Sequence, residues 1–196
     1  MNNNYFKNAI ALTGGIATGK STVCNLLKLH GFLTIDADTI THELLNKNSP
    51  TISNMFGPTY IKNGKVLRKK LGHLIFNNKE EKQKLESFIH PLIKEEIIKQ
   101  AKIFEKANKP YIIDIPLFFE TNQYTINKSL VVYAPYSLQC ERLIKRDKIT
   151  EKEAKIKISN QMDIESKKKL ASLCIDNSST LKNLQNEVEK IITQIL

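Results

Sequence analysis

Residues 14–21 read GGIATGKS and follow the apolar run NAIALT, so three of the seven glycines fall within six residues. The stretch fits the spacing G-x-x-x-x-G-K-[ST], with Lys20 and Ser21 directly after Gly19. Glycines let successive backbone N–H groups turn inward around a phosphate, and the N-terminus of a following helix adds positive potential. Lys20 can reach β- and γ-phosphate oxygens, and the Ser21 hydroxyl can ligate Mg²⁺. The residues expected at the phosphates are Gly14, Gly15, Ala17, Thr18, Gly19, Lys20, Ser21 and Thr22.

Carboxylates follow two later apolar segments. Asp36 and Asp38 come after the run FLTI, and Asp114 lies within YIIDIP. Ligands of parallel α/β sheets gather at the carboxyl ends of strands, where the phosphate loop also lies. Asp38 is therefore a candidate base for an attacking hydroxyl, and Asp114 a candidate for the Mg²⁺ shell. Capping of the next helix or turn is the alternative role for Asp36 and Asp114.

Arginine is rare in this lysine-rich chain and occurs only at positions 68, 142 and 146. Gln139, Arg142 and Arg146 are spaced by three and four residues, so on a helix they share one face. Two guanidinium groups over the phosphates could stabilise charge on a transferring group, whereas a solvated face is the alternative. His42 and His90 are each isolated, and a packed or hydrogen-bonded side chain is the alternative to a role at the site.

Phosphate-loop proteins fall into three classes that the sequence can separate. The guanine-reading motif N-K-x-D does not occur, which disfavours a GTPase. A motor or nucleic-acid remodeller usually needs more than 196 residues. A small-molecule kinase needs an acceptor pocket, a carboxylate near the acceptor hydroxyl and mobile cations over the phosphates, and candidates for all three are present.

Strand and helix patterns alternate along the chain. Strands are expected at 8–13, 32–36, 111–116, 129–134 and 173–177, with helices after the phosphate loop, after Asp36, over 136–148, over 149–162 and at the C-terminal end. Residues 50–109 are mostly charged amphipathic helix, in which Pro91 is expected to bend or restart the helix. The pattern predicts an α/β fold with a mainly parallel sheet, helices on both faces and a helical insertion.

The formal net charge of +10 raises the possibility of nucleic-acid binding, but the lysines are spread along nearly every helical segment and no aromatic-basic motif accompanies them. A polyanionic small substrate explains part of the surplus. The three cysteines form no CxxC pair, and the histidines show no metal-site spacing. Together with the start MNNNYFKN, which lacks a secretory signal, and the absence of a long apolar run, this predicts a cytoplasmic protein that is not in a membrane.

Eight segments together resemble the dephospho-coenzyme A kinase family, in the family's order and almost end to end: LTGGIATGKSTV, DADTITHEL, LRKKLGHLIF, LESFIHPLI, YIIDIPLFFE, LQCERLIKR, ISNQM and CIDNSS. The resemblance implies a P-loop, nucleoside-monophosphate-kinase-like three-layer sandwich with a parallel five-stranded sheet, a helical insertion and a lid. The expected single domain, 1–196, has a core of 1–49, 110–139 and 166–196, a CoA-binding subdomain at 50–109 and a lid at 140–165.

The resemblance also implies the reaction and the roles of residues. It implies transfer of the γ-phosphoryl group of ATP to the 3′-hydroxyl of dephospho-CoA with Mg²⁺, in line and directly, as the last step of CoA synthesis. Asp38 is then the candidate base, assisted by Lys20, Arg142 and Arg146, and Asn177 lies near the adenine. The acceptor side is expected to include His42, Arg68, His90, Pro116, Leu117 and Glu120.

The family pattern is not matched at every position. Ala17 and Thr18 stand where the family usually has Gly-Ser, and Lys157 stands where an arginine is common. Ser172 and Ser179 also depart from the usual residues near the adenine pocket.

Two alternatives remain open at this stage: another small-molecule or nucleotide kinase on the same scaffold, and a basic nucleic-acid-binding ATPase. A monomer that binds ATP and dephospho-CoA but no nucleic acid is expected, without excluding an oligomer. Whether Asp38 or Asp114 is the main base is not decided by the sequence.

Overall fold

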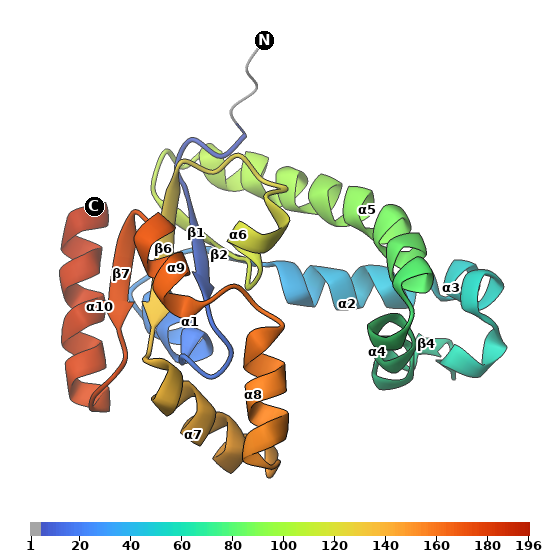
Figure 1. Ribbon diagram of the computed structural model, residues 1–196. Coiled ribbons are helices and arrows are strands. Elements are labelled where there is room, and N and C mark those ends of the chain that lie inside the picture. The colour runs from blue at the N-terminus through green and yellow to red at the C-terminus, as the bar shows by residue number, and fades with distance from the viewer. Residues whose placement is uncertain (1–4) are drawn as a thin grey trace. The chain divides into compact units, whose positions relative to one another are not determined.

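The computed structural model describes residues 5–196, and the first four residues of the predicted core segment 1–49, including the start of MNNNYFKN, lie outside them. Its centre is a five-stranded sheet of order β2-β5-β1-β6-β7, in which β1 pairs in parallel with β5 and β6, and β6 pairs in parallel with β7 (Figure 1). The strands are β1 (Ala9–Gly14), β2 (Thr34–Asp36), β5 (Tyr111–Asp114), β6 (Lys128–Tyr133) and β7 (Leu173–Asp176). The predicted α/β fold with a parallel five-stranded sheet is confirmed.

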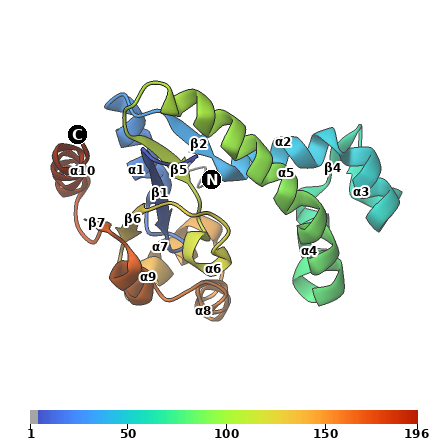
Figure 2. The same cartoon turned by 90° about the horizontal axis from the view of Figure 1, so that it is seen from above.

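Helices cover both faces of the sheet. On one face, α1 (Lys20–Leu29) and α10 (Leu181–Ile195) share a buried cluster with alternate residues of the strands, among them Leu130 and Val132 of β6. Tyr133, the residue after Val132, points the other way, since its hydroxyl donates to Glu165 of α9 (Ile164–Leu170) at 2.6 Å. Figures 1 and 2 show α10 beside β7 at one end of this layer.

The remaining helices of this part of the chain are α6 (Phe118–Thr121), α7 (Tyr136–Asp147) and α8 (Glu151–Ser159). The expected helix over 149–162 ends earlier, at Ser159, and α9 follows as a separate helix that the sequence reasoning missed. Asp163 marks its start, because its side chain accepts the N–H of Ser166 as an N-cap.

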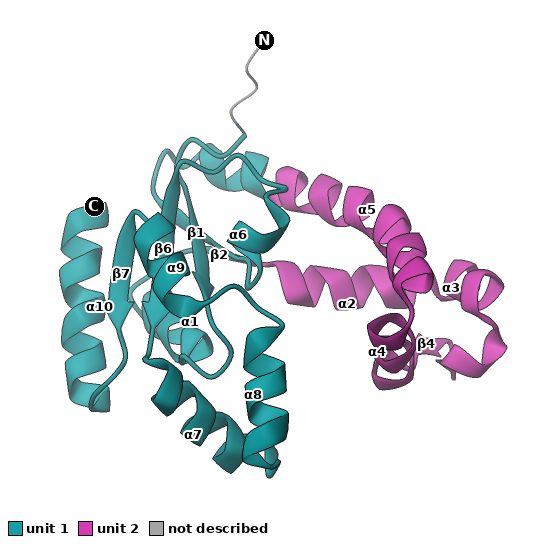
Figure 3. Ribbon diagram, viewed as in Figure 1, with its two compact units in different colours: residues 1–35, 101–196 teal, residues 36–100 magenta. Residues whose placement is uncertain are grey.

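Residues 36–100 form a second compact unit, and residues 1–35 and 101–196 the first (Figure 3). The second unit holds α2 (Ala37–Lys47), α3 (Ser49–Phe56), the 3₁₀-helix η1 (Pro58–Tyr60), β3 (Ile61–Lys62), β4 (Lys65–Val66), α4 (Arg68–Asn77) and most of α5 (Lys79–Glu105). It differs from the expected insertion, 50–109, because α2 packs on α3 and β4 and therefore belongs with them.

Most of residues 50–109 is helical, as expected, but the sequence reasoning missed a hairpin. In it, β3 and β4 pair antiparallel, and the turn residues Asn63 and Gly64 have φ of 50° and 72°. Asn-Gly is the preferred pair for such a turn, so a usable signal was present in the sequence. Of the two outcomes expected at Pro91, a bend or a restart of the helix, the restart does not occur, because α5 runs unbroken through this residue.

Candidate active site

The phosphate loop connects β1 to α1 with the local geometry that its sequence predicts. Gly19 is the N-cap of α1 with φ of 91°, and Ala17 also has a left-handed φ of 61°. In the part of the chain that the structure describes, the backbone N–H groups of Ala17, Gly19, Lys20 and Ser21 donate to no protein acceptor. Four neighbouring free donors at a helix N-terminus form a site for an anion.

Lys20 and Asp114 meet beside this loop. The Lys20 Nζ lies 2.5 Å from Oδ1 of Asp114, and both side chains are largely buried, with 17% and 9% of their surface exposed. Asp114 ends β5, which pairs with β1, and this pairing is what places the carboxylate beside the first helical residue. The structure thus brings together the predicted phosphate lysine and one predicted metal ligand. Ser21, the other predicted metal ligand, is exposed on the first turn of α1.

The loop is enclosed by side chains from three distant segments. Ile16 N donates to Oε1 of Gln161 at 2.7 Å, and Asn177 Nδ2 donates to the Thr18 carbonyl at 2.8 Å. The buried Gln139 lies so close to Gly15 that a Cβ there would be 2.5 Å from its Oε1. Residues that follow β6 and β7 therefore fix the loop backbone from outside, and the contact of Gln161 was missed in the sequence reasoning.

The exposure of the side chains on the predicted basic face of α7 increases toward the C-terminal end of the helix. Gln139 is buried, Arg142 is half-buried and donates from Nη2 to the Asn177 carbonyl at 2.9 Å, and the Arg146 side chain is 58% exposed. Arg146 and Lys157 of α8 both pair with Asp147, at 2.8 and 2.9 Å. Their hydrogen bonds lower the pKa of Asp147 to about 2. Asn177, predicted near the adenine, is thus held between Thr18 and Arg142.

Glu120, predicted on the acceptor side, has an ionic partner that the sequence did not suggest. The ammonium group of Lys167 in α9 is completely buried and lies 2.7 Å from Glu120 Oε1. The same group donates to the carbonyls of Gly14 and Pro116. Burial lowers the pKa of Lys167, and the hydrogen bond to Glu120 opposes that shift. Leu117, by contrast, is exposed.

Five further predicted residues lie in the second unit, namely Asp36, Asp38, His42, His90 and Arg68. The Asp36 carboxylate accepts the Thr39 N–H at 2.9 Å, so Asp36 takes the capping role. β2 ends at Asp36, as expected, and Asp38 stands exposed on the first turn of α2. His42 is exposed on the same helix, and His90 is half-buried on α5.

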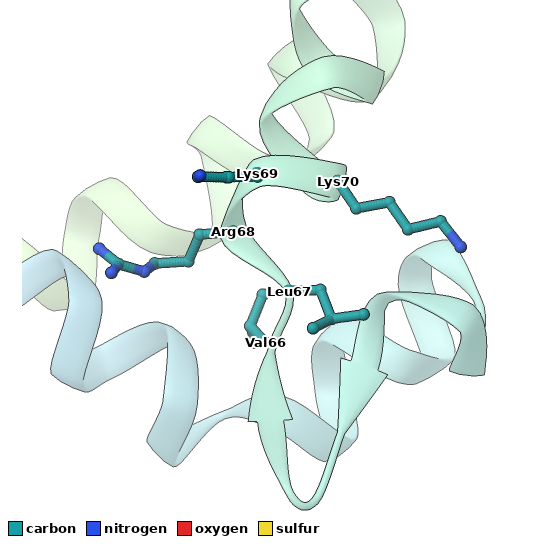
Figure 4. Close-up of a pocket in the computed structure, with 5 residues that line it drawn as sticks. All are labelled: Val66, Leu67, Arg68, Lys69 and Lys70. Carbon is teal, nitrogen blue, oxygen red and sulfur yellow. The ribbon is translucent and has the colours of Figure 1, made fainter. Parts of the chain in front are cut away.

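Arg68 stands at the first residue of α4, beside an open pocket of this unit. Val66, Leu67, Arg68, Lys69 and Lys70 line it, and in Figure 4 the Arg68 and Lys69 side chains extend to one side and that of Lys70 to the other. The pocket combines apolar floor residues with exposed cations, which suits a ligand that carries both apolar and anionic groups.

Residues 5–196 contain no group of three or more His, Cys, Asp and Glu side chains that could hold a metal ion. The three cysteines are free thiols. None of the described helices is long and apolar enough to cross a membrane.

Comparison with known proteins connects this arrangement to one family. The sequence model of the family described as dephospho-CoA kinase matches residues 8–183. A dephospho-CoA kinase of Sulfurimonas denitrificans is 50% identical, with 97% of this chain and 95% of the relative covered. One of Helicobacter pylori strain J99 is 45% identical, with 97% and 98% covered.

Solved structures agree with the sequence matches. A structure described as dephospho-CoA kinase from Campylobacter jejuni is 39% identical, covers 96% of each chain and superposes with a TM-score of 0.77. The protein TT1252 from Thermus thermophilus is 25% identical, with 97% of this chain and 99% of that chain covered and a TM-score of 0.83. The similarity therefore extends over both compact units.

Proposed function

Because the chain belongs to the dephospho-CoA kinase family, we propose that residues 14–21 hold the triphosphate of ATP. As a member of this family, the chain phosphorylates dephospho-CoA with ATP in CoA biosynthesis. In our proposal the γ-phosphoryl group passes directly to the 3′-hydroxyl of dephospho-CoA. The observation that carries this assignment is the set of backbone N–H groups at Ala17, Gly19, Lys20 and Ser21, which lack a protein acceptor in the described structure. Phosphate oxygens are the ligands that such a row of donors binds best.

Lys20 is the residue that contacts the transferring phosphoryl group in this proposal. Its ammonium group is already oriented by Asp114 at 2.5 Å, so little side-chain freedom is lost when the nucleotide binds. Because both side chains are shielded from water, the positive charge acts on the phosphates in a medium of low effective dielectric constant. Arg142 and Arg146 add positive charge from α7 in the segment expected to be the lid.

The residues present fit a magnesium ion. Ser21 offers a hydroxyl and Asp114 a carboxylate, and Mg²⁺ prefers such oxygen ligands while keeping several waters, so no larger cluster of protein ligands is required. When bound, Mg²⁺ supplies charge neutralisation at the β- and γ-phosphate oxygens. The chain's own residues hold the nucleotide and aim its terminal phosphate.

Asp38 is the base that we propose for the acceptor hydroxyl. The two other carboxylates at these strand ends are engaged: Asp36 caps α2, and Asp114 pairs with the Lys20 ammonium group. Asp38 stands exposed on the first turn of α2 and is free of such a pairing in the described structure. This argument favours Asp38 over Asp114.

The acceptor-binding residues in this proposal are His42, Arg68, His90, Pro116, Leu117 and Glu120, and Asn177 borders the adenine. Residues 50–109 bind the CoA part of the acceptor, and residues 140–165 act as the lid. We place the protein in the cytoplasm as a monomer that binds no nucleic acid. The spread of lysines over many helices, rather than in one aromatic-basic motif, supports the last point.

A substrate panel tests the reaction. Purified protein is given ATP and Mg²⁺ with dephospho-CoA, with nucleoside monophosphates or with DNA or RNA, and ADP release is measured. We expect turnover with dephospho-CoA alone, and phosphorus NMR of the product to place the new phosphate on the 3′-oxygen. Phosphorylation of a nucleoside monophosphate at a comparable kcat/KM would favour another kinase of this scaffold. Stimulation by nucleic acid that falls steeply with salt would favour the ATPase alternative.

Replacing Asp38 tests the choice of base. Asp38→Asn should lower kcat by about 10²–10⁴-fold and leave the Kd for ATP within about twofold, because general-base assistance acts in the transition state. Asp36→Asn is the matched control, since asparagine caps helices as well as aspartate and should preserve both stability and turnover. Near-normal turnover in the Asp38 variant would reject this assignment.

A further inference from the structure

Lys167 is the only lysine or arginine of the described residues whose side chain is completely buried. Its Nζ lies 3.0 Å from the Gly14 carbonyl, 3.1 Å from the Pro116 carbonyl and 2.7 Å from Glu120 Oε1. An ammonium group has three N–H donors, so these three acceptors satisfy it completely. Since an apolar side chain of similar size would avoid the desolvation of a charge, the presence of lysine here calls for a specific role.

The three acceptors belong to the parts of the chain that frame the phosphate loop. Gly14 is the last residue of β1 and the first of the loop. Pro116 comes two residues after Asp114, the partner of Lys20, and its carbonyl also accepts the Thr13 hydroxyl at 3.0 Å. One ammonium group therefore connects the end of β1 with the segment that follows β5.

Neighbours of Lys167 in the sequence make the same connection a second time. Gln161 Oε1 accepts the Ile16 N–H at 2.7 Å, inside the phosphate loop. The Met162 N–H donates to Glu120 Oε1 at 3.1 Å, on the oxygen that also faces Lys167. Residues 161–167 thus contact the loop at Gly14 and Ile16, and the segment 116–120 at Pro116 and Glu120.

We infer that Lys167 is a positioning residue, which holds the Gly14 and Pro116 carbonyls in fixed register so that the loop amides and the Lys20–Asp114 pair converge on one phosphate group. The inference rests on the proposed binding of ATP in this loop. Lys167 acts through the backbone and contacts no reacting atom. A displacement of about 1 Å at a reacting centre can cost on the order of 10²-fold in rate, so loss of this link should affect turnover strongly.

The test separates positioning from a contribution to stability. Lys167→Met alone leaves the Glu120 carboxylate buried without its cation, which destabilises the fold in itself. The paired variant Lys167→Met/Glu120→Gln removes both charges, and Glu120→Gln alone measures the part due to Glu120. Lys169→Met is the control, because Lys169 is an exposed lysine of the same helix. For each protein, kcat, the calorimetric Kd for ATP and the thermal midpoint are measured.

We expect the paired variant to recover a midpoint within about 5 °C of the parent while kcat remains lower by about 10²-fold, well beyond the loss in Glu120→Gln. Lys169→Met should match the parent in all three quantities. The inference is overturned if kcat returns together with the midpoint, or if both Lys167 variants fail to fold, since either result assigns Lys167 to stability. If the parent protein itself binds no ATP, the proposed function fails instead.

Discussion

The cations of the phosphate loop and those of residues 66–70 show two different ways of presenting positive charge. Beside the loop, Lys20 is 17% exposed and Lys167 is not exposed at all, and each ammonium group faces a carboxylate. In the second unit, Arg68 and Lys69 are exposed, and the Lys70 ammonium donates to the Thr59 carbonyl and lies 5.3 Å from the ring centre of Tyr60.

The contrast indicates a division of tasks. Shielded, paired charges are oriented before the ligand arrives, and they contribute to the fold as well as to the reaction. Exposed charges remain hydrated and mobile, so they contribute to binding with little effect on stability. A substitution that removes only one partner of a shielded pair near the loop should therefore change activity and stability together, whereas substitutions in residues 66–70 should change binding alone.

Among the substitutions that test this contrast between the two regions, Lys20→Met is expected to have the largest effect. It removes the cation that we propose to contact the phosphates and leaves Asp114, whose side chain is 9% exposed, without that partner. We expect kcat/KM for ATP to fall by about 10²–10³-fold and the free energy of unfolding to fall by about 1–3 kcal/mol. Lys28→Met, at the exposed end of the same helix, is the control. A variant that loses activity at unchanged stability would break the coupling claimed for shielded charges.

Gly19→Ala should have the next largest effect. Its effect on activity should be smaller than that of Lys20→Met, and the main change should be a loss of stability. A Cβ at this position would lie 2.1 Å from Asn177 Nδ2, and the φ of 91° is unfavourable for any other residue. We expect a loss of at least about 2 kcal/mol in the free energy of unfolding and weaker ATP binding. Ala17→Gly is the control, because it introduces a glycine at another left-handed residue of the loop and should leave stability within about 1 kcal/mol. Denaturant unfolding and calorimetry measure both effects.

The two regions also differ in how far the sequence predicted them. The loop could be predicted because its chemistry is local: glycine, lysine and serine at fixed spacing determine backbone and function within eight residues. The sheet followed from apolar runs, whose hydrophobic residues pack the same way in most α/β proteins. The Asn63–Gly64 hairpin carried a local signal that the helical pattern around it obscured.

Lys167 could not be predicted, because its role depends on partners far away in the sequence. It stands in the run KKKL, where three successive lysines look alike, and only the fold turns one of them toward Gly14, 153 positions earlier. The capping role of Asp36 was open for a different reason, since one carboxylate next to a helix start is compatible with either capping or chemistry. The hydrogen bond from the Thr39 N–H assigns Asp36 to capping.

Arg68→Ala tests the other half of the comparison. If Arg68 binds an anionic group of dephospho-CoA, its loss should raise the KM for this substrate by about tenfold, which corresponds to about 1.4 kcal/mol. The thermal midpoint should stay within about 2 °C, since the side chain is exposed. Lys65→Ala, an exposed lysine of the neighbouring strand, should change neither quantity. A clear loss of stability in Arg68→Ala would show that exposure is a poor guide to coupling in this unit.

Asp147→Asn should have the smallest effect. It tests whether the effect of a substitution on stability depends on the exposure of the charges rather than on the unit in which they lie. Asp147 belongs to the same unit as the phosphate loop, but its partners Arg146 and Lys157 are 58% and 46% exposed. Because its pKa is about 2 in the folded protein against an ordinary 3.8, the ion pairs stabilise the fold above pH 3.8 and this contribution is lost as the pH falls toward 2. We expect a difference of at most about 1 kcal/mol between parent and variant at pH 7, shrinking as the pH is lowered through this range. Urea unfolding at several pH values measures it, and a difference of several kcal/mol at pH 7 would place this cluster with the shielded charges.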